Sequence, residues 1–160
     1  CVFHRLTVCR QMTLSTHWGG LFCNSPPYLK ILHVYYIIYK ERRWNMKTRK
    51  EAIAFCLTLP DVYEDYPFHD DNWTLMRHKG TAKTFATIYE RQGNIWLNLK
   101  CDPLLTSMWR SAFSSVIPAY HMNKYHWNSV ILDGTIPDKD IETMIIDSYK
   151  LTYKKPKEKK

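Results

Sequence analysis

The sequence predicts an α+β domain, a two-layer sandwich in which helices pack on one face of an antiparallel sheet. Three segments place apolar residues at helical spacing: 49–58, 103–112 and 138–153. Four segments have the alternation or the β-branched and aromatic content of strands: 73–78, 84–90, 95–100 and 127–132. The order helix, hairpin-linked strands, helix, strands, helix is typical of this architecture.

The first helix is predicted to begin at a capping box and to end at a proline. Thr48 and Glu51 have the spacing at which the threonine hydroxyl accepts from the Glu51 amide while the glutamate reaches back. Pro60 cannot continue the helix. Residues 61–72 contain five acids and three aromatic residues and are expected to form a loop.

A hairpin is predicted in the centre of the chain. The segment 84–90 alternates, with Phe85, Thr87 and Tyr89 on one face. Residues 91–94, Arg-Gln-Gly-Asn, are predicted to form a hairpin turn of the Gly/Asn type, so 95–100 is expected to return antiparallel to 84–90.

The second half is predicted to alternate helix, strand and helix. Asp102 is an N-cap with proline at the first helical position, which begins the helix 103–112. A short edge element is expected at 116–117, an irregular segment at 119–128 and the last strand at 127–132. The final helix opens at Pro137-Asp138.

The net charge of +8 is distributed unevenly along the chain. Residues 1–45 carry +5, residues 46–153 carry −1 and residues 154–160 carry +4. A basic balance favours nucleic acid or an anionic membrane as partner, but here the body is nearly neutral. We expect 46–153 to be the folded domain and 154–160 a disordered basic tail.

Residues 1–45 show no consistent helical or strand period of apolar residues, whereas the first helix signal follows directly after Met46. Codons for Arg42 and Arg43 can form a purine-rich ribosome-binding site just before Met46. We therefore expect 1–45 to be a translated upstream leader, poorly ordered and not native. The alternative is a genuine extension that lies on a membrane surface, since its apolar stretch 28–39 is too short to cross a bilayer.

Cysteine usage and the absence of known motifs argue against an enzyme. The five cysteines include no CxxC pair, which favours a reducing, cytoplasmic setting. Cys101 stands near a helix N-terminus, where a thiol can be activated, but a buried or capping thiol is the preferred interpretation. No P-loop, GxSxG or zinc pattern is present. We expect no cofactor, no metal site and no membrane association.

The densest polar and aromatic segment, 118–128, is the candidate binding segment. Such side chains can contact the phosphates and nucleobases of nucleic acid. The alternative, which the sequence leaves open, is a structural loop whose aromatic side chains pack into the core. Tyr120 and Trp127 are expected to hold its shape. The predicted nucleic-acid-binding residues are Arg77, Lys79, Lys100, Arg110, His121, Asn123, Lys124 and His126.

Several motifs resemble the MmcQ/YjbR family of small bacterial proteins. They are the segments YPF at 66–68, WLNLKCDP at 96–103, PAYHMNKYHW at 118–127, LDG at 132–134 and DSY at 147–149. The resemblance covers 46–153, and the leader has no counterpart in it. It implies a single domain similar to the CyaY-like fold, and it implies DNA binding, because the family is usually labelled so.

The expected function is weak, largely non-specific DNA binding through phosphate contacts. It requires basic residues that are distant in sequence to gather on one side of the domain, away from the acidic residues. One alternative is a module that binds a protein or peptide along a sheet edge. Another is a small-ligand or enzymatic pocket around His121, His126 and Trp127.

Overall fold

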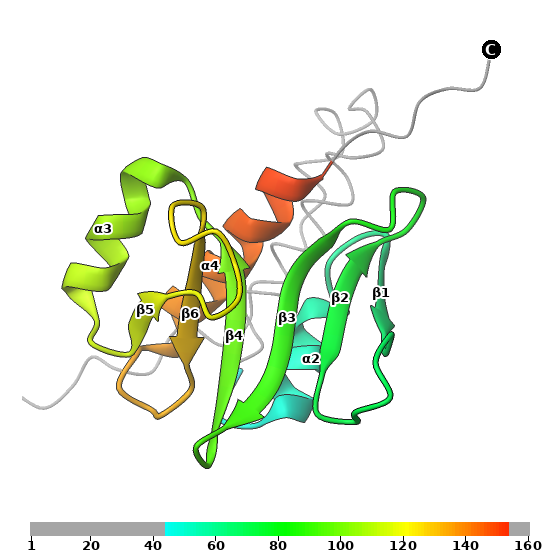
Figure 1. The fold of residues 1–160 in the computed structure, drawn as a ribbon, viewed down its shortest axis with the longest axis horizontal. Helices are drawn as coiled ribbons and strands as arrows, with labels where there is room; N and C mark the ends of the chain where they lie inside the picture. The colour runs from blue at the N-terminus through cyan, green and yellow to red at the C-terminus, as the bar shows by residue number, and fades with distance from the viewer. Residues whose placement is uncertain (1–43, 154–160) are drawn as a thin grey trace, which may run out of the picture. The chain divides into compact units, whose positions relative to one another are not determined.

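The computed structural model describes residues 44–153 (Figure 1). The predictions for the leader, apart from Trp44 and Asn45, and for the tail 154–160 therefore lie outside the described residues. The Trp44 ring meets Phe55 edge-on, with ring centroids 5.4 Å apart. Met46 is buried, and its amide donates to an Asp138 carboxylate oxygen at 3.0 Å.

Three helices and six strands make up the described chain, and the predicted α+β class is confirmed. The helices are α2 (Arg49–Cys56), α3 (Pro103–Ala112) and α4 (Asp138–Thr152). The strands are β1 (Val62–Asp65), β2 (Thr74–His78), β3 (Thr84–Arg91), β4 (Asn94–Lys100), β5 (Val116–Pro118) and β6 (Trp127–Ile131). They form one sheet in the order β1-β2-β3-β4-β6-β5, and each neighbouring pair is antiparallel.

Local signals set most of the element boundaries as predicted. The capping box of Thr48 and Glu51 is formed at the start of α2, and Asp102 caps α3 by accepting from the Leu104 amide at 2.9 Å. Gln92 and Gly93 both have positive φ, 54° and 73°, as a two-residue turn of the type found in tight hairpins requires.

The prediction that 61–72 is entirely a loop was wrong, because β1 lies within it. Val62–Asp65 pairs with β2 as a four-residue edge strand. Only Val62 of the four is buried, so the segment has no clear hydrophobic alternation. Its extended form depends on hydrogen bonds to β2, which local sequence does not encode.

The helices pack on one face of the sheet, as α2 and α4 do behind the strands in Figure 1. That face supplies the buried core residues Ile88, Leu97, Leu99 and Val130. Phe85 also reaches it, although strict alternation predicted it beside Tyr89. The register passes from Met76 opposite Ala86 to Arg77 opposite Thr84, so Phe85 is an unpaired bulge residue.

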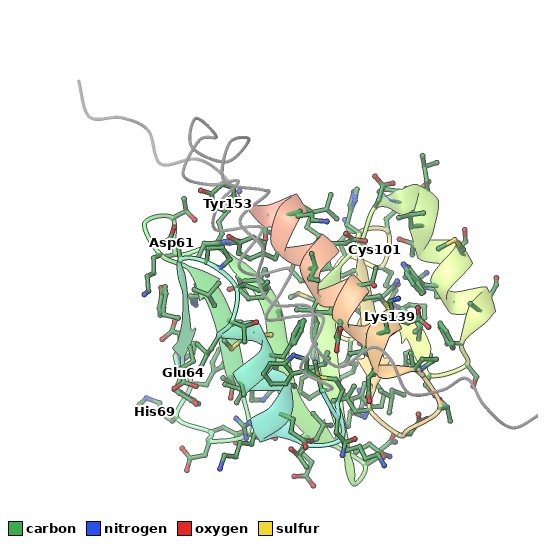
Figure 2. All side chains as sticks on the ribbon, turned by 180° about the vertical axis from the view of Figure 1, so that it is seen from behind. Asp61, Glu64, His69, Cys101, Lys139 and Tyr153 are labelled. Atoms are coloured by element: carbon green, nitrogen blue, oxygen red, sulfur yellow. The ribbon has the colours of Figure 1, made fainter. Side chains whose placement is uncertain are left out.

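Hydrogen bonds fix α4 across the sheet. The Ser148 hydroxyl accepts from the Lys100 amide at 2.7 Å and donates to the Phe85 carbonyl. One turn later, Thr152 bonds the buried His78 ring at 2.8 Å. The C-terminal end of α4 therefore lies where β2 and β4 end, and Figure 2 shows Asp61 and Tyr153 at this end, with Glu64 and His69 toward the other. Within 44–153, every helix is too short or too polar to cross a membrane.

Candidate nucleic-acid interface

The antiparallel register brings basic residues from distant segments together at one end of the sheet. β2 ends, β3 begins, β4 ends and β6 begins there, with Lys100 opposite Trp127 and Arg77 opposite Thr84. We call this the basic end. It carries seven basic residues, Arg77, Lys79, Lys83, Lys100, Arg110, Lys124 and Lys150, and three acids, Asp61, Asp102 and Asp147. Asp65 is counted with them as a fourth acid, because its carboxylate pairs with Arg77, although its backbone lies farther along β1, opposite Leu75. Its formal charge is therefore +3.

The opposite end of the same domain is acidic. We call it the acidic end. It carries five basic residues, Lys47, Arg49, Lys50, Arg91 and Lys139, and nine acidic residues, Glu51, Glu64, Asp70, Asp71, Glu90, Asp133, Asp138, Asp140 and Glu142. The described domain is nearly neutral as a whole but is polarised along its strands.

Some charges of the basic end are neutralised locally. The Arg77 Nε lies 2.6 Å from an Asp65 carboxylate oxygen, and Arg77 also donates to the Ala82 carbonyl at 2.8 Å. Lys150 pairs with Asp147 at 3.4 Å. Lys79 and Lys124 are exposed and Lys100 is half-buried. These three ammonium groups make no hydrogen bond or ion pair with residues 44–153.

Arg110 anchors the candidate binding segment to α3. Its guanidinium donates to the Asn128 side-chain oxygen at 2.9 Å, to the Lys124 carbonyl at 2.6 Å and to the Trp127 carbonyl at 3.3 Å. These bonds hold the end of the loop against the helix. The guanidinium is thus engaged inside the protein.

The segment 119–126 is a loop whose backbone is tethered and whose polar side chains face solvent. The Tyr120 amide donates to Ser129 Oγ at 3.2 Å, and the Tyr120 carbonyl accepts from Asn98 at 3.3 Å. The Asn123 side chain accepts from the Tyr125 amide at 2.9 Å. The exposed members of the predicted site in this loop are His121, Asn123, Lys124 and His126, while Trp127 at its end is half-buried.

His121 has a left-handed backbone, with φ of 57°. For a residue with a side chain this conformation costs about 1–2 kcal/mol. It places the imidazole against the Tyr120 ring, with centroids 3.9 Å apart. Strain of this kind persists only where the surrounding contacts hold it, and the tethers at Tyr120 supply them.

The sheet face opposite the helices carries an aromatic cluster that the sequence analysis missed. Trp73 stacks on Tyr89 at 4.2 Å, and Tyr89 lies opposite Trp96 in the register. The Arg91 guanidinium carbon lies 5.1 Å from the Trp96 centroid and 4.0 Å from the Tyr120 centroid. Strand alternation places Tyr89 and Arg91 on one face, so this part of the cluster could have been predicted.

Below the cluster lies a buried hydrogen-bond network. Tyr89 donates to the Asn98 side-chain oxygen at 3.3 Å, and Ser129 donates to the same oxygen at 2.6 Å. All three residues are buried. The network links β3, β4 and β6 to the loop and restricts the movement of the sheet residues on which the aromatic side chains pack.

A cleft of about 260 Å³ lies between α3 and α4, on the helix side of β4 and β6. Its lining is largely apolar and includes Leu99, Leu105, Trp109, Val130 and Met144. It is therefore distinct from the pocket predicted around His121, His126 and Trp127.

Neither described cysteine has the environment of an activated thiol. Burial raises the pKa of Cys56 far above its ordinary value. Burial is also the main reason that the pKa of Cys101 is raised, while a hydrogen bond from Thr106 acts in the opposite direction. Residues 44–153 hold no group of three or more His, Cys, Asp or Glu side chains arranged to bind a metal.

A model of the protein family described as YjbR matches residues 57–151. The chain belongs to the YjbR family. Relatives include the uncharacterized protein YjbR of Escherichia coli K12, 32% identical over 102 residues, which are 64% of this chain and 84% of that protein. The uncharacterized protein YyaQ of Bacillus subtilis is 34% identical over 67% of this chain and 99% of its own.

Solved structures share the YjbR fold. The Deinococcus radiodurans protein DR2400, a DUF419 domain, superposes with a TM-score of 0.62 at 34% identity, over 69% of this chain and 81% of its own. A Pseudomonas syringae crystal structure gives a TM-score of 0.60 at 28% identity, over 66% of this chain and 99% of its own. The YjbR match runs from the end of α2 into α4, so the basic end, the loop and the aromatic cluster all belong to the family domain.

Proposed function

We propose that this YjbR domain binds DNA weakly, with little sequence preference, through phosphates at the basic end. One observation carries the proposal: bases from β2, β4, α3 and the loop converge where the formal charge is +3, while excess acid lies at the other end. A polyanion is oriented by such a charge distribution even when the net charge is small.

Three lysines are the main phosphate contacts in this proposal. Lys79, Lys100 and Lys124 have ammonium groups that no carboxylate of the described chain neutralises. Three contacts correspond to a slope of roughly −3 for log K against log salt, or about a 40-fold loss between 50 and 200 mM salt. Affinity is expected to be micromolar or weaker, because non-specific binding rests on this term alone.

The other predicted site residues have separate roles. His121, Asn123 and His126 offer exposed polar groups beside Lys124. Arg77 contributes little net charge because Asp65 neutralises it. Arg110 is a positioning residue that shapes the loop. The five lysines of 154–160 follow Tyr153 in the chain and add non-specific attraction.

The test is a fluorescence-anisotropy titration of labelled duplex DNA with the full chain at 50 and 200 mM salt. The triple variant K79Q/K100Q/K124Q is expected to lose at least tenfold in affinity. The matched control, K47Q/K50Q/K139Q, removes the same charge from the acidic end and is expected to stay within twofold. Absence of binding by the unmodified chain at 50 mM salt, or equal losses in both variants, refutes the proposal.

Binding of a peptide along a sheet edge is less well supported. The edge strands β1 and β5 have four and three residues, and β5 ends in Pro118, which has no amide to donate. An added strand would find few backbone partners there. Association that does not respond to salt would favour this alternative.

A further inference from the structure

Arg91 is a half-buried cation without an anionic partner. Its guanidinium lies against Trp96 and Tyr120, at 5.1 Å and 4.0 Å from the ring centroids. Within 44–153 it has no hydrogen-bond acceptor and no carboxylate partner. Glu90, its neighbour in the chain, points to the opposite face by strand alternation. These cation–π contacts use the faces of the two rings and occupy none of the guanidinium N–H donors.

Trp96 supplies a second unused donor in the same cluster. The residue is 5% exposed, and its indole nitrogen is buried with no acceptor in the described structure. Buried tryptophan N–H groups usually find a partner. The donor belongs to one of the two rings that hold Arg91, so both unused donors belong to the same aromatic cluster.

His121 supplies a third polar group. Its strained backbone sets the imidazole against Tyr120, the other ring that holds Arg91. Arg91 is the last residue of β3 and His121 belongs to the 119–126 loop, and the Tyr120 ring contacts both side chains. Strain that positions an exposed polar side chain is typical of binding sites.

We propose that Arg91, Trp96 and His121 form a binding site for the phosphoryl group of a small phosphate ester. A guanidinium presents paired N–H donors that match two phosphoryl oxygens, and the indole and imidazole can bond the remaining oxygen. The site goes beyond the proposed DNA contact, because Arg91 and Trp96 are not among the three lysine contacts and the Arg91 backbone, opposite Asn94, lies at the acidic end. The 119–126 loop borders both sites. His121 alone is common to both.

The experiment follows the side-chain N–H signal of Trp96 in two-dimensional ¹H–¹⁵N NMR of the full chain at pH 7.0. The signal is assigned as the one missing in W96F. Inorganic phosphate and phenyl phosphate are the two probes, and they distinguish a free anion from an ester. We expect both to shift the signal saturably, with phenyl phosphate binding at least as tightly. Acetate at the same ionic strength is expected to cause no saturable shift.

Two variants test the assigned roles. R91Q is expected to weaken phosphate binding at least tenfold, whereas K139Q, which removes one charge elsewhere at the acidic end, is expected to stay within twofold. H121N keeps a residue type that tolerates positive φ and is expected to bind three- to tenfold more weakly, so it provides a test if R91Q unfolds. Lack of a saturable shift, an equal shift with acetate, or unchanged affinity in the folded variants overturns the proposal.

The DNA titration separates this site from the proposed function. R91Q is expected to keep duplex binding within twofold, and K79Q/K124Q is expected to keep phosphate binding within twofold. Loss of phosphate binding in K79Q/K124Q would overturn the Arg91 site but leave DNA binding at the basic end intact.

Discussion

Replacing Ser148 by alanine tests how α4 is fixed to the sheet. Ser148 is fully buried, and its hydroxyl bonds the Lys100 amide at 2.7 Å and the Phe85 carbonyl. Alanine removes both bonds and leaves the part-buried Lys100 amide and the buried Phe85 carbonyl without this partner. Each loss costs about 1–2 kcal/mol. We therefore expect the free energy of unfolding to fall by roughly 2–4 kcal/mol, a large share of the stability of a small domain.

Urea unfolding followed by tryptophan fluorescence measures this effect. With an m-value of about 2 kcal/mol/M, the midpoint is expected to fall by roughly 1–2 M urea. The control is Ser111→Ala, because Ser111 is an exposed serine of α3, and it is expected to change stability by less than about 0.5 kcal/mol. A loss below about 1 kcal/mol for Ser148→Ala would show that the two bonds do not hold α4 to the sheet.

Two further variants test the buried imidazole and the loop anchor. Burial, followed by the charge of Lys83, lowers the pKa of His78 below 6.5, so the unfolded chain takes up a proton that the folded chain refuses. The free energy of unfolding is expected to be level above about pH 6.5 and to fall below it. Urea unfolding at several pH values measures this fall, which is expected to be smaller in H78Q than in the control variant H126Q. An equal fall in the two variants would contradict the prediction. Arg110→Met removes three hydrogen bonds and is expected to lower the free energy of unfolding by about 2–3 kcal/mol. Amide hydrogen exchange at residues 124–128, the end of the loop, is expected to become faster. Unchanged exchange would show that Arg110 does not anchor the loop.

Elements with local signals were predictable. The capping box at Thr48, the Asp102-Pro103 start of α3 and the Gln92-Gly93 turn lie where expected, because each is decided by bonds within a few residues. Strand alternation also placed Thr87 and Tyr89 together on one face of β3, although Phe85, predicted on the same face, turns to the other. Arg91 follows the same alternation, but no sequence signal indicated that Tyr120, far along the chain, would cover it.

The amino-acid sequence alone determined the α+β class, the family and nearly all helices and strands, since hydrophobic period, caps and turn residues act over short stretches. Only the tertiary structure decided that Val62–Asp65 is a strand, that Phe85 bulges toward α4, that Arg110 is engaged inside the protein and that the bases separate from the acids along the strands. These features depend on register and on contacts between distant segments, and such contacts form only when the whole sheet is assembled.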